Sequence, residues 1–216
     1  MDRTKRVIIF IGRENLAKDS DLQQRICSFI DSEKYSIFND PTDDSGHVSQ
    51  PTFYFKHLVK TILGSFGIWE VTRDYLKRVL GFANDLSEIN RRVVILEAFL
   101  KGFPRQSEFS LVARSAGGIV CAKICSIISI KQVICLGYPF VHPSLGFQAF
   151  RIEALANLTT SMTIFQGLQD PYGAVEVIDK FPLSPKIKLH FLDTDHDFVM
   201  SEAAWANFGK LFKSLL

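Results

Sequence analysis

Residues 109–127 have the sequence FSLVARSAGGIVCAKICSI, and this stretch decides the fold. Residues 109–112 are apolar or small enough to form a buried strand, and residues 117–127 have the periodicity of a helix. Only a short turn separates the two elements. A strand that passes directly into a helix is typical of α/β proteins, so the same alternation is expected elsewhere in the chain.

The rest of the chain repeats this alternation. Short apolar runs predict further strands at residues 7–11, 35–38, 133–136, 162–165 and 187–192. Helices are expected around residues 22–30 and at the end of the chain, where the apolar face comprises Trp205, Phe208, Phe212 and Leu215. The sequence therefore predicts an α/β fold, a doubly wound, mostly parallel sheet flanked by helices, with little or no cap. At 216 residues, a single domain over residues 1–216 is expected.

A further helix is predicted to begin near Asp85 or Ser87 and to end at Gly102, just before Pro104. Its apolar face contains Ile89, Val93, Leu96 and Leu100, and its other face carries Arg91, Arg92 and Lys101. The segment before it, residues 53–80, is rich in aromatic and basic residues. Two interpretations stay open for these aromatic side chains: they fill the core, or they form a small lid or acyl-binding wall.

Composition and charge exclude several classes of protein. Hydrophobic residues make up 47% and charged residues 22%, as in ordinary globular proteins, and the net charge is +2. No run of adjacent basic residues is longer than a pair, so no nucleic acid is expected as a partner. Residues 7–11 are too short for a signal-peptide core, and Lys123 interrupts the apolar stretch 116–130. We therefore expect a cytoplasmic protein with no membrane association.

The four cysteines each lie in an apolar run, and none forms a C-x-x-C pair or neighbours a candidate histidine ligand: Cys27, Cys121, Cys125 and Cys135. Reduced core thiols are the expected state in an intracellular chain. No metal site and no cofactor are predicted, and the sequence does not indicate an oligomeric state.

The turn between strand 109–112 and the following helix carries the first candidate for chemistry. Its sequence from Ala113 to Gly117 matches the nucleophile-elbow pattern G-x-S-x-G, except that alanine stands in the first small position. Ser115 should have a strained backbone there, and Gly117 and Gly118 should allow close packing of the helix. The alternative is an ordinary helix start, since small residues around a serine are common in such places.

Two more polar residues follow predicted strands. Asp170 lies in a turn after residues 162–165, and His196 lies in a loop after residues 187–192. In parallel sheets the ligand crevice lies beyond the carboxyl ends of the strands, so Ser115, Asp170 and His196 should converge. Taken separately, Asp170 could be a turn former and His196 a solvated loop histidine. Together they have the order Ser, Asp, His that is expected of a nucleophile elbow.

These residue types suit nucleophilic catalysis. A serine hydroxyl needs a base, and imidazole is the side chain whose unperturbed pKa lies near neutrality, so His196 is the candidate base. A carboxylate must orient that imidazole. Asp170 is preferred for this role over three acids close to His196 in the sequence, because near neighbours on a tight loop rarely aim at the far ring nitrogen: Asp193, Asp195 and Asp197. Of the other histidines, only His142 could border a pocket; the remaining ones lack such a context: His47, His57 and His190.

An oxyanion hole normally combines two backbone amides. The residue after the nucleophile, Ala116, is expected to supply one of them. The turn that follows residues 7–11 should supply the other, and the Arg13 amide is our choice, with Gly12 bordering the substrate.

With these residues identified, the chain resembles the dienelactone-hydrolase-like branch of the α/β-hydrolases, and within it the small, lid-poor bacterial members. The likeness extends over residues 111–198 and rests on five ordered blocks: Ala113–Gly118; Leu136–Phe140 with His142 and Pro143; Gln166–Gly167 with Asp170–Gly173; Leu183–Pro185; and Asp195–Phe198. The resemblance implies the triad of Ser115, Asp170 and His196. It also implies a pocket wall formed by Tyr138, Pro139 and Phe140.

The chain departs from that branch in its first half. Relatives have a His-Gly-rich turn after the first strand, where this chain has Ile11-Gly12-Arg13-Glu14, and residues 39–84 form a longer and different stretch. Three functions are therefore considered. The first is hydrolysis of a small-molecule carboxylic ester or thioester of a small to medium acyl group. The second is ligand binding without catalysis, with a degenerate oxyanion turn, and the third is acyl transfer to an acceptor other than water.

Overall fold

The computed structural model describes residues 6–13, 20–42 and 69–216, with side chains in the long helix α3 described from Asp85 onward. The chain falls into two compact units, residues 1–43 with 89–216 and residues 44–88, and each is considered by itself. The single domain predicted for residues 1–216 stays a prediction. The aromatic side chains of residues 53–80, for which two interpretations stay open, lie outside the described side chains.

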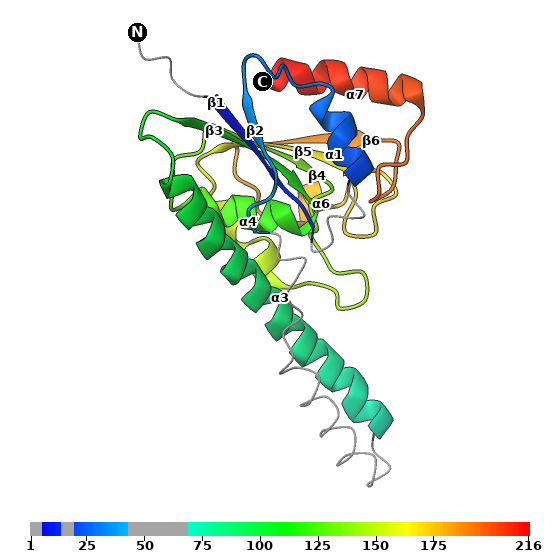
Figure 1. Ribbon diagram of the computed structural model, residues 1–216. Helices are drawn as coiled ribbons and strands as arrows, with labels where there is room; N and C mark the ends of the chain where they lie inside the picture. Colours follow the sequence, from blue (N-terminus) through cyan, green and yellow to red (C-terminus); the bar gives the residue numbers. More distant parts are fainter. Residues whose placement is uncertain (1–5, 14–19, 43–68) are drawn as a thin grey trace. The chain divides into compact units, whose positions relative to one another are not determined.

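The first unit contains a sheet of six parallel strands in the order β2-β1-β3-β4-β5-β6 (Figure 1). The strands are β1 (Arg6–Ile11), β2 (Ser36–Phe38), β3 (Glu108–Arg114), β4 (Gln132–Leu136), β5 (Ser161–Gly167) and β6 (Ile187–Leu192). The predicted parallel sheet is confirmed. The strand order reverses direction between β1 and β3, and ligand sites of doubly wound sheets lie at such a reversal, beyond the carboxyl ends of the strands.

Helices cover both faces of this sheet. The helical elements are α1 (Ser20–Cys27), α3 (Trp69–Lys101), α4 (Ala116–Ile124), the 3-10 helix η2 (Ala149–Arg151), α5 (Glu153–Ala156), α6 (Val177–Lys180) and α7 (Glu202–Leu215). In Figure 1, α1 and α7 lie on one side of the sheet and α4 on the other. Among the described residues, none of these helices is long and apolar enough to cross a membrane.

The closing helix α7 packs as its periodicity predicts. Trp205, Phe208 and Phe212 are buried, and the Phe208 ring meets the Phe165 ring of β5 edge to face at a centroid distance of 4.8 Å. The same cluster includes Ile8, Ile26 and Ile134, which come from β1, α1 and β4. One face of the sheet is therefore joined to both α1 and α7 by a single apolar core.

Helix α3 differs from the prediction in two ways. It begins at Trp69, so Asp85 and Ser87 lie within the helix and do not cap it. Relative to alanine, an aspartate or serine inside a helix lowers helix stability by only a few tenths of a kcal/mol, about as much as favourable residues in the adjacent turns restore. The predicted apolar face is confirmed, because Ile89, Val93, Leu96 and Leu100 are all buried. The placement of Arg92 on a separate polar face is wrong, since its side chain is 3% exposed.

Phe208→Ala should lower the free energy of unfolding by about 3–5 kcal/mol, because it leaves a cavity in the core between β5 and α7. Phe147→Ala is the matched control: this ring is 57% exposed, and its loss should cost less than about 1 kcal/mol. Urea unfolding followed by circular dichroism measures both. Equal losses in the two variants would contradict this assignment of the core.

Candidate active site

Ser115 occupies a sharp turn between β3 and α4. Its backbone has φ 50° and ψ −120°, a conformation that non-glycine residues rarely adopt, so the predicted strain is present. Hydrogen bonds hold it in place: the Ser115 amide donates to the Leu136 carbonyl oxygen at 3.1 Å, and the Gly118 amide donates to the Ser115 carbonyl oxygen at 2.8 Å. These two hydrogen bonds, one to the end of β4 and one within the first turn of α4, keep Ser115 in its strained conformation.

The two glycines after Ser115 allow α4 to approach the sheet. A side chain at Gly117 would overlap the Ile11 carbonyl oxygen and lie 2.8 Å from that of Gly12. At Gly118, a Cβ atom would lie 2.6 Å from the Cys135 Sγ. The close packing of the helix predicted from Gly117 and Gly118 is therefore confirmed, and its partners are the ends of β1 and β4.

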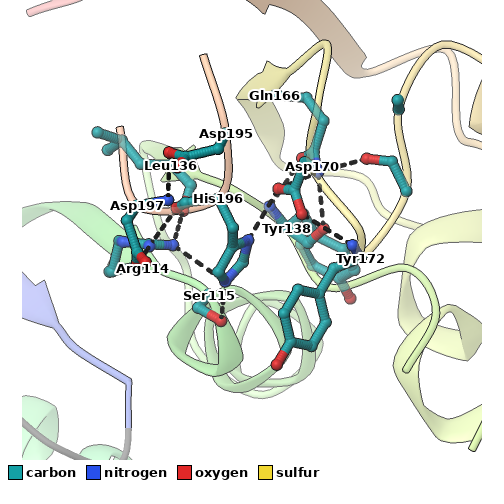
Figure 2. Close-up of polar contacts among 12 residues, drawn as sticks. Arg114, Ser115, Leu136, Tyr138, Gln166, Asp170, Tyr172, Asp195, His196 and Asp197 are labelled. Atoms are coloured by element: carbon teal, nitrogen blue, oxygen red, sulfur yellow. Dashed lines mark hydrogen bonds and ion pairs between the residues drawn. The ribbon is translucent and has the colours of Figure 1, made fainter. Parts of the chain in front are cut away.

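The His196 ring lies between Ser115 and Asp170 (Figure 2). Its Nε2 is 2.9 Å from the Ser115 Oγ, and its Nδ1 is 2.8 Å from the Asp170 Oδ2. A carboxylate only accepts hydrogen bonds, so Nδ1 carries the ring proton and donates a hydrogen bond to Asp170. In the neutral ring, Nε2 is then the acceptor for the serine hydroxyl. The structure thus brings together the three residues that the sequence selected, from the carboxyl ends of β3, β5 and β6.

Asp170 is held by two residues of the resemblance blocks to which the sequence assigned no role. Its Oδ2 accepts a hydrogen bond from the Gln166 Nε2 at 2.8 Å, and its Oδ1 accepts one from the Tyr172 amide at 2.8 Å. The Tyr172 ring also lies against the His196 ring, with centroids 4.3 Å apart. Gln166 is fully buried, so its amide requires hydrogen-bond partners; the sequence alone shows only a polar residue directly after the apolar run of β5.

The three rival acids have other partners. Asp193 accepts from the Gln169 side chain at 3.1 Å, and the Asp195 side chain accepts from the Asp197 amide at 2.9 Å. The Asp197 carboxylate pairs with the Arg13 guanidinium at 2.8 Å, and this hydrogen bond lowers the pKa of Asp197 below its usual value. Asp170 is thus the acid in hydrogen-bonding contact with the imidazole.

Arg114, the residue before Ser115, has a buried side chain that contacts the histidine loop. Its Nη1 lies 3.4 Å from the His196 Nε2 and donates to the Leu136 carbonyl oxygen at 3.2 Å. Its Nη2 donates to the His196 carbonyl oxygen and lies 3.5 Å from the Asp197 carboxylate. A guanidinium is only a donor, so its position next to Nε2 agrees with an unprotonated nitrogen there. The elbow pattern leaves this position unspecified, so nothing in the sequence indicated a role for Arg114.

The oxyanion-hole candidates lie at the reversal between β1 and β3. Ala116 is the first residue of α4, and amides in a first helical turn have no partner within the helix. Arg13 follows β1 by two residues, and its side chain reaches Asp197, next to His196 in the sequence. Gly12 lies beside α4, and its own amide donates to the Asp40 Oδ2 at 2.7 Å.

The side chains predicted to form the pocket wall lie in the core. Tyr138 and Phe140 are fully buried, with ring centroids 4.9 Å apart, and the Tyr138 hydroxyl donates to the Arg151 carbonyl oxygen. Pro139 is buried as well. His142 contacts the Tyr172 ring at a centroid distance of 6.2 Å, one ring away from His196. The three residues are therefore buried, and their role as a pocket wall stays a prediction.

The four cysteines are free, and within the described ranges no cluster of three or more potential ligands could hold a metal ion. Burial raises the pKa of the Cys125 thiol to about 11 and also raises the pKa values of Cys121 and Cys135. At neutral pH these thiols are therefore protonated and poor nucleophiles.

Cys121 and Cys135 should accordingly react with Ellman's reagent only after unfolding. The native protein is compared with the protein in guanidinium chloride, where all four thiols should react. Rapid modification of four thiols in the native protein would contradict this prediction.

Gln166→Glu should destabilise the protein most at alkaline pH. The new carboxyl would face Asp170 and the carbonyl oxygens of Tyr138 and Gly173, so its pKa in the folded state rises above the unfolded value of about 4.3. The free energy of unfolding should therefore fall as pH rises, and be lower by about 2–3 kcal/mol near pH 8 than near pH 5, relative to wild type. Gln169→Glu, at an exposed position, is the control and should show no such trend. A parallel pH dependence in both variants would contradict the prediction.

Comparisons with known proteins agree with this architecture. The alpha/beta hydrolase domain family matches residues 83–212, more than half of the chain, and the chain therefore belongs to this family. None of the curated proteins matches the sequence.

Similar solved structures share the fold at low sequence identity. An alpha-beta serine hydrolase homologue from Coxiella burnetii is 14% identical with a TM-score of 0.60, over 100% of this chain and 86% of that one. An esterase from Pyrococcus furiosus is 12% identical with a TM-score of 0.57, over 98% and 82%. The thioesterase domain of the curacin biosynthetic pathway is 12% identical with a TM-score of 0.61, over 97% and 91%.

Proposed function

We propose that this α/β-hydrolase is a serine hydrolase that cleaves a carboxylic ester or thioester of a small to medium acyl group. The observation that carries the proposal is the single His196 ring within hydrogen-bonding distance of both the Ser115 hydroxyl and the Asp170 carboxylate. Esterases and a thioesterase among the similar folds support the reaction class. The proposal includes the dienelactone-hydrolase-like branch and a cytoplasmic location.

The reaction proceeds through an acyl-enzyme. The His196 Nε2 accepts the Ser115 proton while the Oγ attacks the carbonyl carbon, and the amides of Ala116 and Arg13 donate to the resulting oxyanion. The imidazolium then returns the proton to the departing alkoxide or thiolate. In the second half, His196 takes a proton from water, whose oxygen attacks the acyl carbon. The bond between that carbon and the Ser115 Oγ then breaks, the imidazolium returns its proton to the Oγ, and the acid leaves.

One observation favours a second candidate, a binding protein without catalysis. The Gly12 amide donates to the Asp40 carboxylate. The turn after β1 therefore has one amide fewer with which to bind an oxyanion. A serine activated by its histidine would distinguish the enzyme from the binding protein, because binding alone does not require such activation.

Ser115→Ala should abolish labelling by a fluorophosphonate probe and lower kcat for a chromogenic acetyl ester by about 10⁴-fold or more, because the acyl-enzyme cannot form. His196→Ala should have the same effect, since the hydroxyl loses its base. Mass spectrometry locates the adduct. Ser201→Ala is the control, because this serine caps α7.

Two outcomes would refute the proposal in different ways. Undiminished hydrolysis by Ser115→Ala would assign the activity to another group. A folded wild type that neither reacts with the probe nor hydrolyses the ester would favour the binding protein.

Asp170→Asn should lower kcat by about 10⁴-fold with little change in KM, because an amide permits the wrong tautomer of His196. Asp193 also follows the carboxyl end of a strand, β6, but its side chain contacts Gln169. Asp193→Asn should therefore retain wild-type kcat. Steady-state kinetics of both variants compare the two carboxylates. A larger loss of kcat in Asp193→Asn than in Asp170→Asn would show that Asp193, and not Asp170, orients His196.

A further inference from the structure

A buried ion pair holds the turn that follows β1. The Gly12 amide donates to the Asp40 Oδ2 at 2.7 Å, and the Arg92 Nη2 donates to the Gly12 carbonyl oxygen at 2.6 Å. The same Nη2 lies 3.0 Å from the Asp40 Oδ2. Both polar groups of the Gly12 backbone are therefore engaged by one pair of charged side chains.

Thr42 completes this network. The Asp40 Oδ1 accepts from the Thr42 amide at 2.8 Å and from its hydroxyl at 2.6 Å, and the Arg92 Nε donates to the Thr42 Oγ1 at 2.8 Å. The side chains of Asp40 and Arg92 are 2% and 3% exposed. In such surroundings hydrogen bonds between charged groups are strong, and their geometry is well defined.

The pair is better suited to orienting the backbone than to stabilising the fold. Removing two charges from water offsets most of their mutual attraction, so a buried ion pair is a weak source of stability. A trans peptide, in contrast, has its C=O and the next N–H pointing in opposite directions, and no peptide bond in the described part of the chain is cis. By holding the Gly12 carbonyl, Arg92 also sets the direction of the Arg13 N–H.

We propose that Asp40 and Arg92 are positioning residues for the oxyanion hole, which orient the Gly12–Arg13 peptide so that the Arg13 N–H meets the developing oxyanion. This inference rests on the proposed serine-hydrolase function. Two contacts place the Gly12–Arg13 turn next to the proposed nucleophile and base. The Gly12 carbonyl is packed against Gly117 of the elbow, and the Arg13 side chain pairs with Asp197, the neighbour of His196.

This role has a kinetic signature. An amide aimed at the oxyanion interacts with the transition state and not with the bound ester, so its misalignment lowers kcat and leaves KM nearly unchanged. Loss of one oxyanion donor costs about 10²–10³-fold in kcat, which is the upper limit for the effect. Arg92→Lys retains the charge but not the planar fork that joins Gly12, Asp40 and Thr42, and should lower kcat by about tenfold or more.

The test compares three variants of the full chain with wild type, using the same acetyl ester. Arg92→Lys alters the fork, and the double variant Asp40→Asn/Arg92→Gln removes both charges so that neither is left unpaired. Arg151→Lys is the control: this arginine is also buried, and its Nε donates to the Gln148 side chain at 2.6 Å. Melting temperatures establish that each variant is folded.

A second measurement separates orientation from a general structural effect. A trifluoromethyl ketone forms an adduct with Ser115 that carries an oxyanion, whereas the matching methyl ketone does so poorly. In both Arg92 variants the affinity for the trifluoromethyl ketone should fall in parallel with kcat, with KM within about twofold of wild type. Arg151→Lys should retain both values.

The outcomes are distinct. Folded Arg92 variants with wild-type kcat and inhibitor affinity, or with losses confined to KM, would overturn the positioning role. If neither charge variant folds, Thr42→Val decides, because it removes the hydroxyl on which Arg92 is anchored; a kcat equal to wild type in that variant would also overturn the role. Hydrolysis that persists in Ser115→Ala would overturn the proposed function, and the positioning role with it. Hydrolysis that depends on Ser115 but not on Arg92 would overturn the inference alone.

Discussion

The close approach of α4 to the end of β1 is the constraint on which the site depends. It is possible because Gly117 has no side chain, and because the preceding Ser115 adopts a positive φ that turns the chain sharply from β3 into α4. The same approach brings the start of α4 next to the turn after β1. The nucleophile and both proposed oxyanion donors therefore come from one packing contact between a helix and a neighbouring strand.

Around this contact, the loops at the carboxyl ends of the strands are joined by charged side chains. Arg114 binds the carbonyl of His196, Arg13 pairs with Asp197 in the same loop, and Arg92 holds Gly12. Each is a guanidinium, whose several donors can bind carbonyl and carboxylate oxygens at once. Loops of different strands thereby keep fixed positions relative to the imidazole, and a site that must hold atoms within hydrogen-bonding distance requires this.

The acid side of the imidazole is supported by neutral groups instead. Gln166 donates to Asp170, and the Tyr172 amide donates to its other oxygen. Amide donors stabilise the carboxylate without adding a positive charge that would compete with the imidazolium formed during turnover. The proposed reaction thus has guanidinium groups near the nucleophile and neutral donors near the orienting acid.

The sequence by itself determined the alternation of strands and helices, and it selected Ser115, Asp170 and His196. Apolar periodicity is a local property, and parallel strands place their carboxyl ends at one edge. Only the tertiary structure decided that Arg92 lies inside, that Tyr138 and Phe140 belong to the core, and that Arg114 and Gln166 support the site. Helical periodicity placed Arg92 with polar neighbours, because the burial of a charge depends on partners such as Asp40, which lies 52 residues away in the chain. Contacts of this kind leave no mark in the local sequence, since they exist only once distant segments have come together.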